Sequence, residues 1–326
     1  MSRILRALEA FAVGDAMGMV TEFMTRRQIS TRFDFVSDLL EPEHSPIHKN
    51  LTKGQITDDT EQVIYLTRLY HEKGNFSQET VKEALCRWED ECDPVAKGYI
   101  GPSTKRAIEA FKNRQDFESL GTTSGAPMRV LAPVLCNLDK SEKHLVEAIR
   151  NCTVPTHNTN LALEASLAVG FAYYYAARGL NADGIAEAAI RGSKVCEKLT
   201  CAEFVGPSAG ERLAAIKGLI GGQHPDDFLD RLYYVFGTTM EAVDVAVAAI
   251  AIGLFCRDDV WLAIRMGASI GGDTDTIAAI AGALSSLQGD ANNIPHFITQ
   301  RVLKANEDLD LEKHARYIEK MSDIDD

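Results

Sequence analysis

The chain has 326 residues, of which 45% are hydrophobic and 25% are charged, so its composition is that of a globular protein with a large apolar core. The formal net charge of -13, without a basic stripe in the sequence, excludes a protein that binds the phosphate backbone of nucleic acids. The most hydrophobic segment, 243–256, contains Asp244 and is shorter than the roughly 20 apolar residues that span a bilayer, which excludes a membrane-spanning helix.

The cysteines and the N-terminal residues indicate the cellular compartment in which the protein is expected. Seven cysteines form no CxxC pair, and an odd number does not fit a fully paired disulfide framework. Free thiols are typical of a reducing compartment. The first residues lead directly into an amphipathic pattern, with no charged and then apolar leader that ends in small residues. We therefore expect a soluble cytoplasmic protein without a membrane partner.

The first predicted helix spans residues 2–13, where apolar residues repeat at helical spacing. It leads into Gly14-Asp15-Ala16-Met17-Gly18, whose two glycines permit close packing of the backbone. Glu22 follows four residues later. Judged locally, Glu22 is a solvated acid at the end of a helix.

A long loop is expected over residues 30–55, which have no clean periodicity and contain two prolines. Loops of that length are more often functional lids than spacers. His44 and His48 lie in this segment without a cysteine or carboxylate at a recognised metal-ligand spacing. Both are therefore interpreted as loop histidines.

The next helix is expected to begin at Thr57-Asp58-Asp59-Thr60. Thr57 is a good N-cap and acids suit the positive end of a helix, so local stability alone can account for this sequence. Adjacent aspartates nevertheless repel each other, and a bound cation would relieve the repulsion. Successive helical side chains diverge by about 100°, so Asp58 and Asp59 would address different ions, or one an ion and the other a water beside it.

Two glycine-bearing loops and one histidine precede later helices. Lys97–Thr104 is expected to form a turn that caps the helix 103–112, with Pro102 well placed just before it. The small and hydroxyl-bearing residues of Gly121–Arg129 form either a nest of backbone amides for an anion or a ribose, or a plain loop. His157 is a structural hydrogen-bond partner at a helix entrance or, as an alternative, a neighbour of the site.

Helical spacing of apolar residues dominates the rest of the chain, and alternating runs long enough for strands are absent. The remaining predicted helices cover about 77–90, 103–112, 130–136, 141–150, 159–178, 183–199, 208–220, 226–236, 240–256, 258–269, 274–287 and 295–304. We therefore predict an all-α protein. In the absence of repeats and flexible linkers, residues 1–326 are expected to form one domain, with a frayed tail at 321–326.

The motif Gly271-Gly272-Asp273-Thr274-Asp275-Thr276 lies between two apolar helical runs. Asp and Thr are ordinary N-cap residues after a glycine hinge, so capping alone is one interpretation. Asp273 and Asp275 can also project from one irregular turn toward a common point, as ligands of a cation do. The second acidic cluster at residues 57–60 favours the cation site.

Oxygen donors from three parts of the chain thus form the ligand set of a hard divalent cation. They are Glu22, Thr57, Asp58, Asp59, Asp273, Asp275 and Thr276. No cysteine or histidine at zinc-ligand spacing occurs among them, so the set selects Mg²⁺ or Mn²⁺ over Zn²⁺. Five carboxylates exceed the charge of one ion, and two ions about 3.5–4 Å apart are the natural filling.

On these motifs, the sequence resembles the ADP-ribosylglycohydrolase family, which includes the dinitrogenase-reductase-activating glycohydrolases and the J1 crystallins of the eye lens. The resemblance spans nearly the whole chain, and the paired aspartate motifs in this order and spacing are highly specific. Its carriers are Gly14–Gly18 with Glu22, Thr57–Thr60, Gly98-Tyr99 with Gly101–Thr104, Met128-Arg129 with Ala132-Pro133, Thr156-His157, and Gly271–Thr276.

The resemblance implies an orthogonal all-α bundle with a binuclear Mg²⁺ or Mn²⁺ centre that cleaves an N- or O-glycosidic bond to ribose. It implies that the metal ligands are Thr57, Asp58, Asp59, Asp273, Asp275 and Thr276. Glu22 matches an acid that contacts the metal or a water on it, and we expect catalysis by Glu22, Asp58 and Asp275. Substrate contacts are expected from Gly101, Ser124, Gly125, Met128 and His157.

The favoured function is removal of ADP-ribose from a protein side chain or a small conjugate. Ser124-Gly125 stands where many members have Asn-Gly, Gly121 replaces an acid, and Asn158 follows His157 in place of Pro-Asp. These departures motivate an alternative, a hydrolase of a small nucleoside or other glycoside. A third hypothesis is a non-catalytic, crystallin-like relative, which the intact acidic motifs oppose because buried unpaired carboxylates cost on the order of several kcal/mol each. The linkage, the choice of Mg²⁺ or Mn²⁺ and the oligomeric state stay open.

Overall fold

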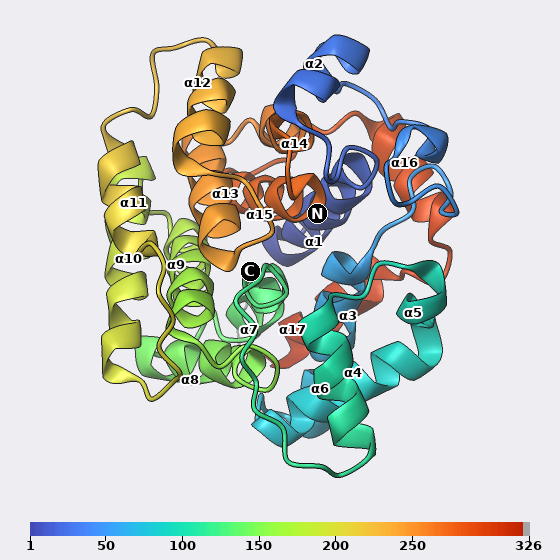
Figure 1. Ribbon diagram of the computed structural model, residues 1–326, viewed down its shortest axis with the longest axis vertical. Helices are drawn as coiled ribbons and strands as arrows, with labels where there is room; N and C mark the ends of the chain where they lie inside the picture. The colour runs from blue at the N-terminus through green and yellow to red at the C-terminus, as the bar shows by residue number, and fades with distance from the viewer. Residues whose placement is uncertain (322–326) are drawn as a thin grey trace.

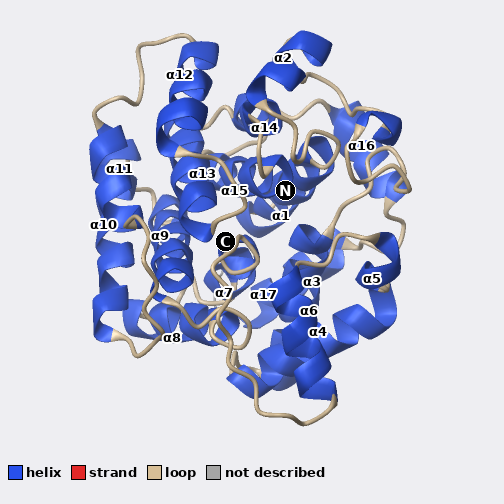
Figure 2. Cartoon of the chain, in the orientation of Figure 1, coloured by secondary structure: helices blue, strands red, loops and turns tan. Residues whose placement is uncertain are grey.

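Helices form nearly all the regular structure of residues 1–321, the part of the chain that the computed structural model describes. Within these residues there are isolated β-bridges but no strand (Figure 1; Figure 2). The expected all-α class is confirmed. Met321 ends the last helix, and the rest of the tail expected to be frayed, 322–326, lies outside the described residues.

The elements follow one another along the chain with mostly short connections. They are α1 (Arg3–Gly18), α2 (Arg26–Phe33), η1 (Pro42–His44), α3 (Asp58–Lys73), α4 (Gln78–Cys92), α5 (Pro94–Lys97), α6 (Pro102–Lys112), η2 (Pro127–Val130), α7 (Leu131–Leu135), α8 (Glu142–Thr153), α9 (Asn160–Ala177), α10 (Ala182–Val195), η3 (Cys196–Lys198), α11 (Ala209–Lys217), α12 (Pro225–Arg231), η4 (Leu232–Phe236), α13 (Ala242–Cys256), α14 (Val260–Ile270), α15 (Thr274–Gln288), α16 (His296–Ala305) and α17 (Leu311–Met321). The η elements are short 3₁₀-helices, except η4, which is a π-helix.

Helices α1 and α15 pack backbone to backbone in the middle of the molecule (Figure 1). A Cβ atom at Gly14 would lie 2.4 Å from the carbonyl oxygen of Ala278, and one at Gly18 would lie 2.3 Å from that of Thr274. Side chains do not approach a backbone so closely, so only glycine fits at these positions. Since Thr274 begins α15, the contact at Gly18 fixes the N-terminus of α15 against α1.

Helix α13 is apolar on every side and packs against α9 and α15. Its one charged residue, Asp244, accepts hydrogen bonds from Arg212 (2.5 Å) and from the hydroxyl of Thr239 (2.7 Å). A helix with no polar face is typical of a protein core. In residues 1–321, no helix combines the length and the hydropathy that a membrane span requires.

Three differences separate the observed helices from the predicted ones. Helix α1 continues to Gly18 rather than ending at residue 13, because its glycines lie in the contact with α15. The predicted helix 226–236 divides into α12 and η4. Helices α2, α5 and α17 are missing from the predictions, and α2 extends into the loop expected at 30–55; α2 buries only Arg26 and Ile29, so it has little apolar periodicity.

Candidate metal centre

The three acidic segments meet at one cavity of about 270 Å³. The turn after α1 contributes one carboxylate to its lining, the first turn of α3 contributes two, and the N-terminus of α15 contributes two. These residues are Glu22, Asp58, Asp59, Asp273 and Asp275, and Thr276 lines the cavity beside them. The close packing of α1 on α15, with α3 beside both, thus brings the two ends of the sequence together.

Asp15, a fully buried residue of α1, fixes the first turn of α3. Its carboxylate accepts hydrogen bonds from the backbone N–H and hydroxyl of Thr57 (3.0 and 2.8 Å) and from the same groups of Thr60 (3.1 and 2.6 Å). Thr57 therefore makes no side-chain capping bond of its own. Because Asp58 and Asp59 lie between these two threonines, Asp15 sets their position relative to α1.

No role was expected for Asp15 from the sequence. The signal that was available is a lone carboxylate between Gly14 and Gly18, in a stretch of helix that is otherwise apolar. A carboxylate at such a position must find hydrogen-bond donors inside the protein.

The N-terminus of α15 is fixed by two glycines in the left-handed region, Gly271 (φ +87°) and Gly272 (φ +89°). A Cβ at Gly272 would lie 1.8 Å from the carbonyl oxygen of Thr238, which accepts a hydrogen bond from the backbone N–H of Asp273 (3.0 Å). The backbone of Gly272 also accepts a bond from Phe23 (2.8 Å). The residue after Glu22 and the residue before Asp273 are therefore held together by the main chain.

Burial and mutual repulsion oppose the charged forms of these acids. Burial raises the pKa of Asp58 and of Asp275 well above the usual value, and the nearby carboxylate of Glu22 adds to both effects. Burial and Asp15 likewise raise the pKa of Asp59 well above its usual value. Each of these carboxylates therefore needs a proton or a positive partner.

The nearest buried cation, Arg129, does not neutralise the acids by direct contact. Its guanidinium donates to the hydroxyls of Thr156 (2.8 Å) and Thr104 (3.3 Å), and burial lowers the pKa of Arg129 to about 10. Among the described residues, no ion pair joins Arg129 or any other cationic side chain to Asp58, Asp59, Asp273 or Asp275. One positive charge behind the cavity is less than the carboxylates require.

The donor set fits divalent cations. One carboxylate oxygen of Asp59 and one of Asp273 are buried without a hydrogen-bond partner among the described residues. Such atoms are rare unless an ion or water satisfies them. The surrounding donors are oxygens, which hard cations such as Mg²⁺ and Mn²⁺ prefer.

His48 lies in a loop, as expected, but its side chain also belongs to the same cavity, which the sequence did not indicate. Its side chain is 2% exposed, and its Nε2 lies 2.5 Å from Oε2 of Glu22. Ligand atoms of Glu22, His48 and Asp275 all lie within 4.8 Å of one another. No local pattern signals this, because His48 and Glu22 are 26 residues apart and meet only through the fold.

The cavity wall is formed by loops and first turns of helices. Four of the five residues expected to contact substrate, Gly101, Ser124, Gly125 and Met128, line it. Tyr99 also lines it and donates its hydroxyl to Glu61 (2.8 Å), an acid one turn beyond Asp58. Ser124 hydrogen-bonds to Asp273, so the wall contacts the acids directly.

His157 and Thr57 do not line the cavity. His157 is fully buried between Thr156 (2.6 Å) and Thr123 (3.1 Å), and a Cβ at Gly121 would lie 2.3 Å from its ring. Burial lowers the pKa of His157 well below its usual value, so the ring is neutral. We therefore replace the expected substrate contact with support of the 121–125 loop.

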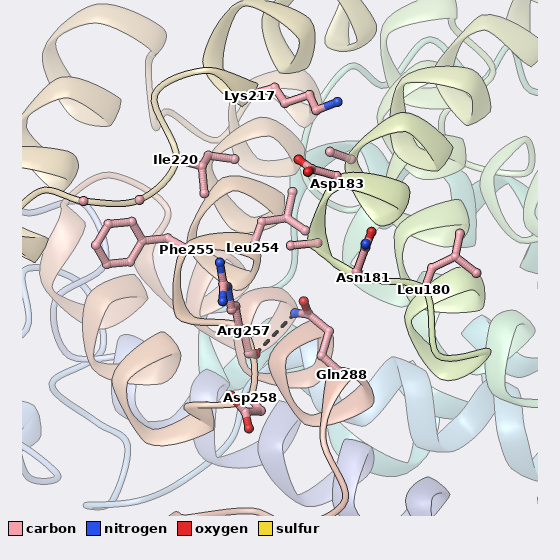
Figure 3. Close-up of a pocket in the computed structure, with 14 residues that line it drawn as sticks. Leu180, Asn181, Asp183, Lys217, Ile220, Leu254, Phe255, Arg257, Asp258 and Gln288 are labelled. Atoms are coloured by element: carbon pink, nitrogen blue, oxygen red, sulfur yellow. Dashed lines mark hydrogen bonds between the residues drawn. The ribbon is translucent and has the colours of Figure 1, made fainter.

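A larger cavity of about 740 Å³ lies elsewhere, between α10, α11 and the C-terminal end of α13 (Figure 3). Its charged side chains have both signs, and Asp183, Arg257 and Asp258 are exposed to solvent. Gln288 donates to the backbone oxygen of Arg257 (3.3 Å) at its edge. Size alone does not identify this cavity as a reactive site, since it has no cluster of buried, unpaired groups among the described residues.

Comparison with known proteins places this geometry in context. A model of the ADP-ribosylglycohydrolase family matches residues 1–323. An uncharacterized protein of Escherichia coli (strain K12), YegU, is 25% identical over 324 residues, which cover 98% of this chain and 96% of that protein. An ADP-ribosyl-[dinitrogen reductase] glycohydrolase of Rhodospirillum rubrum is 25% identical over 305 residues, or 89% of this chain and 87% of that one.

A solved structure also has the same fold. It is described as an ADP-ribosylglycohydrolase-related protein complex and matches with a TM-score of 0.68 and 24% sequence identity. The match covers 98% of both chains, so the helical architecture agrees from end to end.

Proposed function

Because the chain belongs to the ADP-ribosylglycohydrolase family, it is a hydrolase of glycosidic bonds, and we propose that it removes ADP-ribose from a protein side chain or a small conjugate by means of two divalent cations. The observation that carries this proposal is the convergence of Asp58, Asp59, Asp273 and Asp275 on one cavity. The name of the R. rubrum relative, which acts on ADP-ribosylated dinitrogen reductase, supports the substrate class.

The residues that would hold the ions come from two helix N-termini. They are Thr57, Asp58, Asp59, Asp273, Asp275 and Thr276. When bound, Mg²⁺ or Mn²⁺ would supply positive charge and Lewis acidity at the sugar hydroxyls and the attacking water. Thr57 is consistent with this role although it does not line the cavity, because its hydroxyl donates to Asp15 and keeps lone pairs for an ion.

Glu22 would move the proton. Hydrolysis of a ribosyl bond passes through a state with positive charge on the sugar, and the attacking water must lose a proton. His48 occupies Oε2 of Glu22, so Oε1 is the oxygen that would accept it. The other expected catalytic residues orient the site: Asp275 uses Oδ1 to accept the N–H of Thr276 (2.9 Å), and Asp58 uses Oδ2 to accept from Gln62 (3.3 Å), which leaves one oxygen of each for the cavity.

The size of the cavity indicates that it would enclose only part of an ADP-ribosyl substrate. A cavity of about 270 Å³ is just below the ~300–1,000 Å³ typical of sites that enclose a drug-sized ligand. The ribose would occupy it, and the remainder of an ADP-ribosyl group would extend along the wall. The N-terminus of α6, whose N-cap Gly101 brings no side chain, faces the cavity and would offer N–H donors to the diphosphate.

A second candidate is a hydrolase of a small nucleoside or other glycoside. The small cavity favours it, and so does the absence of lysine and arginine among the described residues that line the cavity. Such a substrate has no diphosphate to neutralise. Both candidates use the same acidic centre and differ in what lies against the wall.

A substrate panel distinguishes the two. Hydrolysis of ADP-ribosylated proteins, O-acetyl-ADP-ribose and nucleosides would be measured with Mg²⁺, with Mn²⁺ and with a chelator, and Asp273→Asn would serve as the inactive control. We expect turnover of an ADP-ribosyl conjugate that both chelation and the substitution abolish. Turnover of nucleosides alone would favour the second candidate. Turnover that neither the chelator nor the substitution lowers would exclude the metal centre.

A further inference from the structure

We propose that His48 is a positioning residue that holds the Glu22 side chain in the orientation needed for reaction, an inference that rests on the role proposed for Glu22 above. The two side chains are 2.5 Å apart between Nε2 and Oε2, and they are 2% and 14% exposed. A hydrogen bond between an imidazole and a carboxylate in so buried a place is stronger than one in water.

The two residues are anchored on opposite sides of this contact. The Ser45 hydroxyl oxygen accepts bonds from the backbone N–H groups of His48 (2.9 Å) and Ile47 (3.3 Å), so the imidazole projects from a tight turn. The backbone N–H of Glu22 donates to Gly18 (3.1 Å), and the next residue is bonded to Gly272. With both main chains fixed, the freedom that is left belongs to the Glu22 side chain, and His48 removes it.

The contact with Glu22 favours one tautomer of His48. When the carboxylate of Glu22 accepts this hydrogen bond, Nε2 of His48 carries the proton. Nδ1 is buried and has no partner among the described residues, which suits a nitrogen without a proton.

The same partners argue against His48 as a metal ligand. A histidine that coordinated an ion through Nε2 would carry its proton on Nδ1 and donate it to a neighbouring acceptor. Among the described residues no such acceptor lies at Nδ1. We therefore assign His48 to Glu22, although its ring also lies near Asp275, and the metal titration below separates this role from ligation of an ion.

One consequence concerns the two oxygens of Glu22. Oε2 is engaged by His48, so only Oε1 can face the reacting atoms. Without the imidazole, Glu22 would keep its place in the chain, but its side chain would sample several rotamers. Loss of orientation lowers the rate of the chemical step, and a displacement of about 1 Å can cost on the order of 100-fold.

The test compares four proteins on the conjugate that the wild type hydrolyses best: wild type, His48→Ala, His48→Gln and, as a matched control, His44→Ala. His44 lies on the same segment but is exposed and outside the cavity. We expect His48→Ala to lower kcat by roughly 10- to 100-fold with KM and Mn²⁺ affinity within about twofold. The amide of His48→Gln can donate an N–H and should restore part of kcat, and His44→Ala should match the wild type.

Two measurements that do not depend on turnover complete the test. Calorimetric titration of each variant with Mn²⁺ separates positioning from ligation, and ¹⁵N NMR of the wild-type imidazole reads the tautomer directly. A proton on Nε2 supports the proposal even if His48→Ala fails to fold. A proton on Nδ1, an unchanged kcat in His48→Ala, or a loss of Mn²⁺ affinity of tenfold or more would overturn it. Failure of the wild type on every substrate would instead count against the proposed function, and the NMR result would still decide the tautomer.

Discussion

The floor and the wall of the cavity are built differently. The floor, Asp58, Asp59, Asp273 and Asp275, lies on two helix N-termini that a buried carboxylate and close glycine contacts fix to α1. The wall, residues 98–104 and 123–128, lies on loops and first turns; a Cβ at Gly101 would meet nothing within 4 Å, whereas one at Gly125 would lie 2.9 Å from the ring of His157. The acids of the floor are therefore held rigidly by main-chain contacts, whereas the wall has room for a larger side chain at Gly101.

The largest expected effect follows from removing one acid of the floor. Asp273→Asn keeps the size of the side chain but removes a charge that a cation would need. We expect kcat to fall by roughly 10³-fold, as when an essential catalytic group is lost. Because burial and Glu22 raise the pKa of Asp273 in the metal-free protein, the same variant should be at least as stable as the wild type without metal. Thermal unfolding in a chelator checks this, and a marked loss of stability there would mean that Asp273 is structural.

The second effect concerns the packing that fixes the floor. In Gly18→Ala the new methyl group would collide with the backbone of Thr274 and Asp275, neither of which can move aside cheaply. We expect a loss of roughly 3 kcal/mol in the free energy of unfolding. Gly101→Ala, which adds the same methyl group to the wall in open space, is the matched control and should cost no more than about 1 kcal/mol, because alanine is a poorer N-cap for α6 than glycine. Equal effects in urea denaturation would remove the distinction between floor and wall.

The third effect is a pH dependence of metal stabilisation. Burial raises the pKa of Asp58, Asp59 and Asp275 well above the usual value, so their contribution to stability in the metal-free protein is present at low pH and is lost as pH rises through the folded-state values. Ions compete with these protons. The increase in Tm caused by Mn²⁺ should therefore grow from pH 5 to pH 8.

The buried His157 acts in the opposite direction, since its lowered pKa makes stability fall as pH drops. His157 has this effect both with and without metal. The difference between the Tm with Mn²⁺ and the Tm with chelator therefore reports on the acids of the floor. A difference in Tm that stays constant or shrinks as pH rises would contradict protonated carboxylates in the metal-free site. Calorimetric scans with Mn²⁺ and with chelator provide both curves.

The smallest effect is expected at the wall. Gly101→Val adds bulk beside the substrate and touches no acid of the floor. We expect KM to rise by about tenfold, with Mn²⁺ affinity within twofold of the wild type. Steady-state kinetics and a Mn²⁺ titration measure the two quantities separately, and a parallel loss of metal affinity would show that the wall also shapes the floor.

Sequence patterns revealed the parts of the site that are local. Asp58-Asp59 and Asp273 with Asp275 stand at helix starts, where spacing along the chain already constrains direction. The convergence of both motifs on one cavity agrees with the expected site, and the roles assigned to each residue stay predictions.

Pairings across the fold were beyond such patterns. Asp15 meets Thr57 through the packing of α1 beside α3, and His48 meets Glu22 because a long loop folds back over the turn after α1. His157 shows the converse: its place in a family motif suggested substrate, but burial behind Gly121 gives it a supporting role. The spacing of residues along the chain does not show which distant side chain will pack against a particular residue.

We propose above all that the carboxylates of the floor bind two divalent ions. Equilibrium dialysis of the wild type and Asp273→Asn against Mn²⁺, with the bound metal counted per chain, tests it most directly. We expect two ions per wild-type chain and a loss of at least one in the variant. Fewer than one ion per wild-type chain, or equal binding by both proteins, would contradict it.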